Sequence, residues 1–330
     1  MKKRSFKESL GLTIRGILMG AADVIPGVSG GTIAFITGIY QELLSSISSI
    51  NIESIKLILK GDPKGFWKAI NGNFFFFLFL GIGISIISLA SIISDIIGNP
   101  NETKEKVILW SFFLGLISAS SIYIGKQIEK WNLKSIVGIL IGTGIAFYIS
   151  VASPATGTDA HWYIFICGII AICAMILPGI SGSFILLLMG VYPTVLGSIS
   201  NLLNGVKETN INLIIENGIT LAVFATGCII GLLSFARLVS FLFKKAPTIT
   251  LAVLTGFLIG SLNKVWPWKN TLVFRNNSHG ESVPYIQENL MPNEYMSING
   301  DHYIVVAMVF ALFGFAMVFG IEWLGKKMKK

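Results

Sequence analysis

The stretch PGVSGGTIAFITGIY at residues 26–40 occurs a second time, in modified form, as PGISGSFILLLMGVY at residues 178–192. When the two copies are aligned without a gap, 11 of the 23 positions from residue 26 to residue 48 are identical. The matches include proline, glycine and tyrosine, which apolar sequence rarely matches at fixed spacing by chance. We therefore interpret the chain as two related halves, each built around one copy of the motif.

The composition places both halves in a membrane. Of the 330 residues, 53% are hydrophobic and only 13% are charged, whereas a soluble chain carries roughly 25% charged residues. A chain this apolar has too little polar surface to cover soluble domains. The net charge of +8 comes from short basic clusters between apolar runs, which is typical of membrane topology and argues against a nucleic-acid partner.

Six apolar segments are long enough, or nearly long enough, to cross a bilayer. A hydrocarbon core about 30 Å thick requires roughly 20 residues of helix. The predicted spans are residues 73–97, 107–125, 135–151, 219–243, 248–265 and 303–324.

Two further apolar stretches, residues 10–24 and 162–177, are too short to span and end at the two Pro-Gly pairs. Proline removes a backbone donor and breaks a helix. We therefore predict two re-entrant hairpins over residues 10–50 and 162–203, in which two short helices enter the membrane and return to the same side. The returning half-helices are expected over residues 32–44 and 184–199.

The order of these segments predicts an all-α polytopic membrane protein with an inverted-topology repeat. Residues 1–151 form one half and residues 152–330 the other, and each half is a re-entrant hairpin followed by three spans. Three is odd, so the second half begins on the opposite side of the membrane, a plan common among secondary transporters. Residues 263–302 are expected to form an external connection, with tryptophans 266 and 268 as interfacial anchors.

The distribution of basic residues supports this topology. With both termini in the cytoplasm, 17 lysine and arginine residues lie on the cytoplasmic side and 6 on the outer side. The positive-inside rule requires such a bias. It would be lost if the first hairpin crossed the membrane fully.

The Pro-Gly motifs are the predicted substrate site. A break there leaves unpaired N–H groups at the start of the next helix, glycine allows close approach of a ligand, and the helix end carries partial positive charge. Together with the hydroxyl groups, this predicts an anion site without a fixed cation. The alternative is that the motifs only cap half-helices and pack against each other. The candidate residues are Pro26, Gly27, Ser29, Gly30, Gly31, Thr32, Pro178, Gly179, Ser181, Gly182 and Ser183.

Four ionisable residues near the membrane are also candidates, because charge inside a bilayer is costly and points to function. Asp23 is expected either to bind and release a proton or to cap the broken helix, and its counterpart in the second copy is Met175. Arg15 either extends to the cytoplasmic surface or attracts a lipid phosphate. Glu42 is expected at the membrane interface, and its alternative role is to couple transport to an ion. Arg237 is expected to be a phosphate counter-ion or to extend to the surface.

The remaining chemistry-bearing residues predict no metal or cofactor site. The three cysteines lie within apolar stretches and have no CxxC spacing, so neither a zinc site nor a disulfide framework is indicated. The three histidines are far apart in sequence, in or beside polar connections.

The paired motifs and the Gly-Ala-Ala-Asp sequence at residues 20–23 resemble the PopT-type family of bacterial polyprenyl-phosphate transporters. The resemblance covers essentially the whole chain. It implies a flippase in the bacterial cytoplasmic membrane that returns undecaprenyl phosphate, the lipid carrier for cell-wall glycans, from the outer to the inner leaflet. The motif residues would then contact this lipid. The second copy has Ser183 and Phe184 where the first has Gly31 and Thr32, so the two sites should differ.

Two other functions compete with transport of this lipid. Membrane undecaprenyl-pyrophosphate phosphatases have a similar Pro-Gly-x-Ser stretch, but hydrolysis needs a fixed cation and a general acid or base. An arginine follows the motif serine in such enzymes, whereas Gly30 and Gly182 stand there in this chain, so we predict that it is not an enzyme. A small-anion channel or exchanger is the second alternative. The predicted partners are the polyprenyl phosphate and membrane lipids, and the sequence is compatible with a homo-oligomer.

Overall fold

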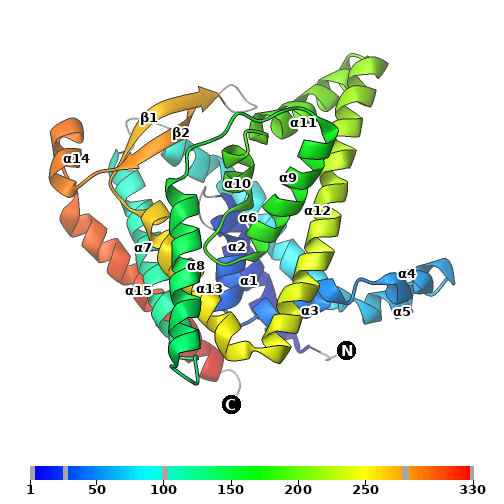
Figure 1. Cartoon of the computed structure of the whole chain (residues 1–330), viewed down its shortest axis with the longest axis horizontal. Coiled ribbons are helices and arrows are strands. Elements are labelled where there is room, and N and C mark those ends of the chain that lie inside the picture. The colour runs from blue at the N-terminus through cyan, green and yellow to red at the C-terminus, as the bar shows by residue number, and fades with distance from the viewer. Residues whose placement is uncertain (1–3, 25–28, 99–102, 277–281, 328–330) are drawn as a thin grey trace.

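The computed structural model describes residues 4–24, 29–98, 103–276 and 282–327. The chain is largely helical, and α1 begins and α15 ends at the same end of the molecule, opposite the strands (Figure 1). The elements are α1 (Phe6–Val24), α2 (Gly30–Ile36), α3 (Tyr40–Ser48), α4 (Ile52–Leu59), α5 (Pro63–Ala69), α6 (Gly72–Gly98), α7 (Thr103–Gly125), α8 (Leu133–Val151), α9 (His161–Ile176), α10 (Gly182–Leu188), α11 (Tyr192–Lys207), α12 (Ile211–Lys245), α13 (Pro247–Ser261), the 3-10 helix η1 (Leu262–Val265), β1 (Lys269–Asn276), β2 (Ser282–Asn289), α14 (Pro292–Asn299) and α15 (Ile304–Lys327).

Four helices of the described chain are long and apolar enough to cross a membrane, and the number rises to six if each of two bent helix pairs counts as one span. The four are α7, α8, α12 and α13 continued by η1. Helix α12 has 35 residues, about 52 Å of helix. It starts eight residues before the predicted span over residues 219–243 and therefore projects beyond that span. The prediction of a polytopic helical membrane protein with broken helices is therefore confirmed at this level.

Asparagine side chains mark where several of these helices begin. Asn132 accepts a hydrogen bond from the backbone N–H of Ser135 at the start of α8 (3.0 Å), and Asn210 accepts one from Leu213 at the start of α12 (3.2 Å). An N-cap of this kind satisfies one of the free donors at a helix start. The polar residues just before the apolar runs therefore set the helix boundaries.

The long helices pack as four pairs: α1 with α6, α9 with α12, α7 with α15, and α8 with α13. In each pair, glycine residues allow the backbones of the two helices to approach closely. In the α8–α13 pair, a Cβ atom at Gly142 would overlap the backbone carbonyl of Val253, and one at Gly256 would overlap that of Ile139. Such contacts drive helix association in lipid, where the hydrophobic effect between helices is absent.

Both returning half-helices are broken a second time, which corrects the prediction of single helices over residues 32–44 and 184–199. Helix α2 ends at Ile36 and α10 ends at Leu188. Two residues beyond each end, Gly38 and Gly190 have positive φ angles of 73° and 71°. Glycine adopts this left-handed conformation without the penalty of a Cβ and so ends the helix. The axes of α10 and α11 consequently differ by 107°.

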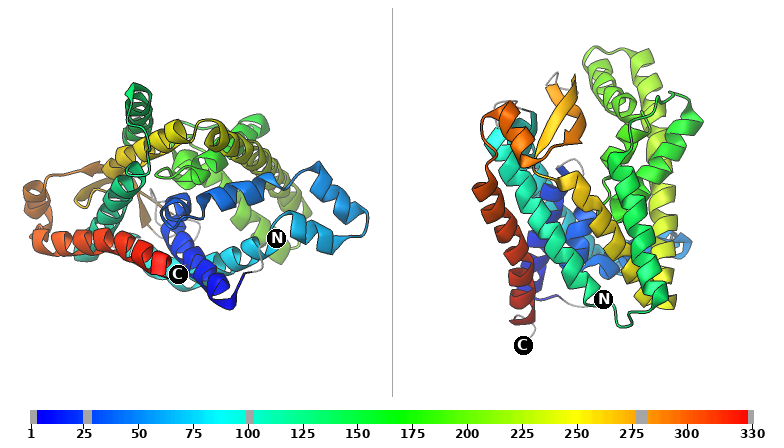
Figure 2. Two further views of the ribbon diagram at one scale, coloured as in Figure 1. Left: turned by 90° about the horizontal axis from the view of Figure 1, so that it is seen from below. Right: turned by 60° about the vertical axis from the view of Figure 1, so that its left-hand side comes forward.

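The short helices α2 and α10 lie inside the molecule, with the longer helices around them (Figures 1 and 2). Nearly every residue of α2 is buried. The molecule therefore encloses the segments that follow the Pro-Gly pairs.

The connection expected over residues 263–302 contains a two-stranded antiparallel sheet, β1–β2, and helix α14. The all-α prediction missed this sheet. Both tryptophans bond to the protein: Trp268 is only 9% exposed and donates to the carbonyl of His302 (2.6 Å), while the half-buried Trp266 donates to the carbonyl of Leu290 (2.8 Å). The indoles thus fasten the connection onto the helices, because a buried indole N–H needs an acceptor. Their position at the membrane interface stays a prediction.

Candidate functional site

The two Pro-Gly motifs, far apart in sequence, touch each other inside the molecule. The Ser29 hydroxyl donates to the carbonyl of Met175 (3.0 Å), and the backbone N–H of Gly179 donates to the Thr32 hydroxyl (2.8 Å). Gly31 lies so close to the carbonyls of residues 175 and 176 that a Cβ atom would meet them. The start of α2 is therefore fitted to the end of α9 and the turn that follows it. Pro26 and Gly27 fall outside the described residues.

The start of α2 is capped from within the protein. The N–H of Gly30 donates to a carboxylate oxygen of Asp23 (2.6 Å), and the N–H of Gly31 donates to the Ser29 hydroxyl (3.1 Å). These amides were expected to be free for an anion, but they already have acceptors, as the alternative of capped half-helices that pack against each other predicted. Asp23 takes the capping position, one of its two expected roles, and places a negative charge at the positive end of the helix. Proton exchange at Asp23 remains a prediction.

The second motif is built differently. Ser181 caps α10 by accepting from the N–H of Phe184 (3.5 Å), and its hydroxyl is 2.9 Å from that of Ser183. Gly179 has a positive φ of 86°, and Gly182 lies against the carbonyl of Ala171. The inequality predicted between the two copies has a structural counterpart, because Thr32 binds the opposite motif whereas Phe184 faces a lysine.

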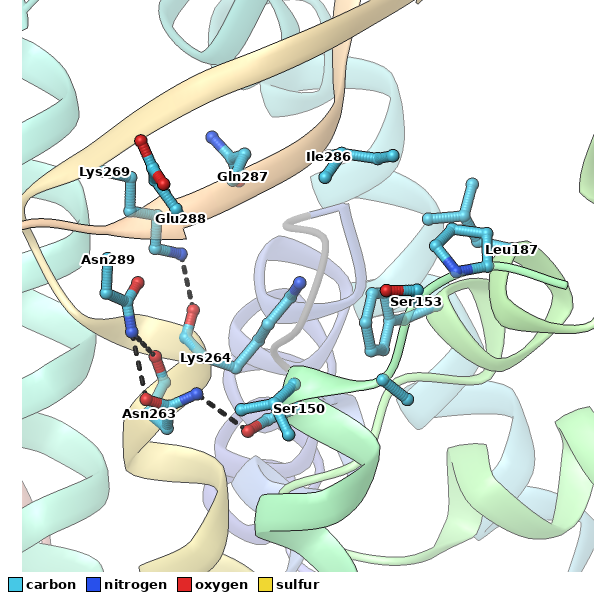
Figure 3. Close-up of a pocket in the computed structure, with 14 residues that line it drawn as sticks. Ser150, Ser153, Leu187, Asn263, Lys264, Lys269, Ile286, Gln287, Glu288 and Asn289 are labelled. Carbon is cyan, nitrogen blue, oxygen red and sulfur yellow. Dashed lines mark hydrogen bonds between the residues drawn. The ribbon is translucent and has the colours of Figure 1, made fainter.

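A cavity of about 290 Å³ opens beside the second motif, at the end of the molecule that carries the strands (Figure 3). Its walls come from the end of α8, the first turns of α10, η1 and the β1–β2 hairpin. Among the lining residues are Ser150, Phe184, Asn263, Lys264, Lys269 and Glu288. The cavity is therefore assembled from both halves of the chain.

Two lysines give this cavity its charge. The ammonium of Lys264 lies 3.8 Å from the ring centroid of Phe184, and that of Lys269 lies 3.6 Å from the ring centroid of Trp110. Lys269 also donates to the carbonyl of Lys264 (2.5 Å). Neither lysine forms an ion pair with any residue that the structure describes. Burial lowers the pKa of Lys269 well below its ordinary value, and the positive charge of Lys264 lowers it further.

Lys264 connects the cavity with the second motif. A void the size of a single water molecule, about 10 Å³, lies between them and is bordered by Ser181, Phe184, Ser261 and Lys264. The sequence patterns did not single out Lys264 and Lys269, which are two of the six basic residues predicted on the outer side. Their position among the few basic residues on that side was the available signal.

Polar hydrogen bonds hold the cavity floor in shape. Asn263 donates from its side chain to the Ser150 hydroxyl (2.9 Å), which joins η1 to the end of α8. Asn289 on β2 donates to the carbonyl of Asn263 (2.9 Å) and to its side-chain oxygen (3.0 Å). The hairpin is therefore bound to the helices at the edge of the cavity (Figure 3).

The other predicted ionisable residues do not join the motifs. Glu42 pairs with Arg4 and accepts from the side chain of Asn71 (3.0 Å), and Arg15 is within electrostatic range of this pair. Arg237 is exposed and donates to the carbonyl of Ile50 (2.7 Å), just beyond α3. Within the described chain, no three of the histidine, cysteine, aspartate and glutamate residues gather as a metal site would require.

The sequence of this chain is similar to those of proteins named as polyprenyl-phosphate transporters. The family model described as undecaprenyl phosphate translocase-like matches residues 19–283. A polyprenyl-phosphate transporter of Vibrio cholerae is 43% identical over 95% of this chain and 96% of its own length, and one of Staphylococcus aureus is 27% identical over 77% and 85%. No solved structure matches. The apolar helices make the chain a multi-pass membrane protein. By its match to the family model, the chain belongs to the undecaprenyl phosphate translocase-like family.

Proposed function

We propose that this protein is a flippase that returns a polyprenyl phosphate, undecaprenyl phosphate in bacteria, from the outer to the inner leaflet of the cytoplasmic membrane. The observation that carries the proposal is the membership of the chain in the undecaprenyl phosphate translocase-like family, and the contact between the two motifs in the interior is compatible with it. Ser29 and Thr32 from one broken helix bind the backbone of Met175 and Gly179 at the other. Irregular backbone at membrane depth is tolerated only where it is buried in protein or lines a cavity. The names of the two relatives supply the class of substrate.

The packing of the helices supports an inverted repeat. If the second half repeats the first, α9 corresponds to α1, α12 to α6, α13 to α7 and α15 to α8. The pair α1–α6 then corresponds to α9–α12, and the pair α7–α15 to α13–α8, and all four pairs are in contact. An inverted repeat around a central site allows one half to rock against the other and so expose the site to each leaflet in turn.

The environment of the motif serines supports transport over hydrolysis. The hydroxyls of Ser29 and Ser181 bond to backbone groups and to a neighbouring serine. Hydrolysis of a pyrophosphate needs a cation and an acid or base at the reacting group, but Gly30 and Gly182 follow the serines. We expect the purified protein to release no phosphate from a polyprenyl pyrophosphate.

Leaflet exchange in liposomes tests the proposal. Purified protein is reconstituted with labelled polyprenyl phosphate, and the fraction accessible from outside is followed over time. We expect faster exchange than in protein-free liposomes, without flux of chloride or inorganic phosphate. No acceleration would refute transport of the lipid, whereas chloride flux would support the small-anion channel.

Thr32→Val tests the role of the motif contact in that assay. The substitution keeps the shape of the side chain but leaves the half-buried N–H of Gly179 without its acceptor, a loss of about 1–3 kcal/mol. We expect exchange to slow severalfold. Thr226→Val is the matched control, because Thr226 is exposed on α12 and bonds only within its own helix. Equal rates for the two variants would show that the contact is not part of the transport path.

A further inference from the structure

We propose that the cavity between η1, the β1–β2 hairpin and α10 binds the phosphate group of the transported lipid, with Lys264 and Lys269 as its counter-ions. This inference rests on the proposed function, because it names the place where that lipid is first recognised. The head group that the cavity would recognise is a phosphate monoester, which carries almost two negative charges at neutral pH.

The charge of the cavity is the first argument. Buried charges in proteins are normally paired, yet these two ammonium groups share one cavity and form no ion pair within the described chain. Aromatic rings and a backbone carbonyl stabilise them only in part, since a cation over an aromatic ring gains about 0.5–2 kcal/mol. An anion with two charges would offset both lysines at once.

One carboxylate lines the same cavity, and its position is compatible with an anion. A side-chain oxygen of Glu288 accepts from the side chain of Asn270 (3.0 Å) on the neighbouring strand. Figure 3 shows the Glu288 carboxylate on the side of the hairpin, whereas the Lys264 ammonium extends into the middle of the cavity. The centre of the cavity is therefore the positive part.

The size of the cavity is the second argument. Its volume of about 290 Å³ is at the lower end of small-molecule sites, which span roughly 300–1,000 Å³. This space suits a head group and not a polyprenyl chain, which would remain in the lipid. Polar contacts among Asn263, Ser150 and Asn289 keep the cavity in shape.

The position of the cavity is the third argument. Lys264 borders both the cavity and the void beside Ser181. A phosphate held by Lys264 would therefore be next to the second Pro-Gly motif, the route toward the centre of the molecule. The β1–β2 hairpin, which lines the cavity, lies at the end opposite the start of α1 and the end of α15 (Figure 1), which is the outer side on the predicted topology. A carrier lipid arriving from the outer leaflet would meet this site first.

Binding to the detergent-solubilised full chain tests the inference without transport. Farnesyl phosphate, farnesol and inorganic phosphate are titrated by calorimetry against the wild type, Lys264→Gln, Lys269→Gln and the control Lys207→Gln, whose lysine is exposed on α11. We expect farnesyl phosphate to bind most tightly. Each cavity variant should lose about tenfold or more in affinity, since bonds to charged groups contribute that much, while Lys207→Gln binds like the wild type.

Three outcomes would overturn the inference. Unchanged affinity in both cavity variants would remove the lysines from the site, and equal binding of farnesol would remove the phosphate as the recognised group. Binding of inorganic phosphate as tight as that of farnesyl phosphate, lost in the same variants, would assign the cavity to free phosphate instead of the lipid.

Further variants separate folding defects and the proposed function from this inference. Lys269→Arg keeps the charge and should retain affinity, and Glu288→Gln removes the carboxylate and should raise it. If the wild type exchanges lipid between leaflets and the lysine variants do so at the same rate, the cavity inference fails while the proposed function stands. If the wild type does not exchange lipid but binds farnesyl phosphate through the lysines, the proposed function fails alone.

Discussion

At the scale of single residues, the two motif copies have diverged into different tasks. Thr32 binds the backbone of the opposite motif, whereas its counterpart Phe184 packs under the ammonium of Lys264. Asp23 caps α2, and its counterpart Met175 supplies the carbonyl that Ser29 binds. The two copies therefore differ in their contacts at these positions, although the motif serines are identical.

Asp23→Asn separates the two roles of this carboxyl group. Asparagine can still accept from the N–H of Gly30, so we expect normal folding, whereas Asp23→Ala should lose about 1 kcal/mol of stability with the cap. If Asp23 carries a proton, a pH gradient should alter leaflet exchange in the wild type but not in Asp23→Asn. Equal responses of the two proteins would leave Asp23 with the capping role alone.

The affinity for farnesyl phosphate should fall as the pH rises above neutrality. The second proton of a phosphate monoester, with a pKa of about 6, is already lost in that range, so the change must come from the protein. Lys269 binds an anion only when protonated, and burial and Lys264 lower its pKa. Lys264 and Glu288 are the other charged groups lining the cavity.

Lys269→Arg is the control for this pH dependence. Arginine stays protonated throughout the range, so the fall in affinity should be smaller and begin at higher pH. Identical calorimetric profiles for the wild type and Lys269→Arg would show that Lys269 is not the titrating group.

At the scale of elements, glycine has two separate uses in this protein. At Gly38 and Gly190 the left-handed backbone ends a short helix, and the repeat alignment already paired these two residues. Within the long helices, glycine allows the backbones of paired helices to approach. The broken hairpins and the tight helix pairs therefore depend on the same residue type for different physical reasons.

Gly142→Leu tests the close pairing of α8 and α13. A side chain at this position would push against the backbone of Val253 and Phe257, and overpacking of this kind costs about 1–3 kcal/mol. We expect a lower melting temperature in detergent. Gly144→Leu is the matched control in the same helix, because a Cβ there meets no atom within 4 Å. Equal melting temperatures of the two variants would show that the close contact between α8 and α13 does not depend on glycine at position 142.

At the scale of the whole molecule, the inverted repeat requires the two hairpins to enter the membrane from opposite sides. In a background without the three cysteines, Lys60→Cys between α4 and α5 should react with an impermeant thiol reagent only from the cytoplasmic side. Lys207→Cys at the end of α11 should react only from outside, because the two hairpins enter from opposite faces. Labelling of Lys60→Cys from outside would make the first hairpin an ordinary crossing and remove the inverted repeat.

Much of this architecture followed from the amino-acid sequence. Hydropathy and proline positions predicted the polytopic helical class and the breaks at the Pro-Gly pairs, because both signals act locally along the chain. The doubled motif identified the residues that meet inside, and Asp23 was correctly singled out with capping as one of its roles. The asymmetry between Thr32 and Phe184 was also visible in the alignment.

Only the tertiary structure decided what those residues contact. The caps on the amides of Gly30 and Gly31 and the β1–β2 hairpin depend on how segments pack after they form. The cavity of Lys264 and Lys269 brings together α8, α10, η1 and the hairpin, which are widely separated along the chain. Local patterns determine which segments are helices in a bilayer, whereas a site made of several segments exists only once packing has fixed their distances.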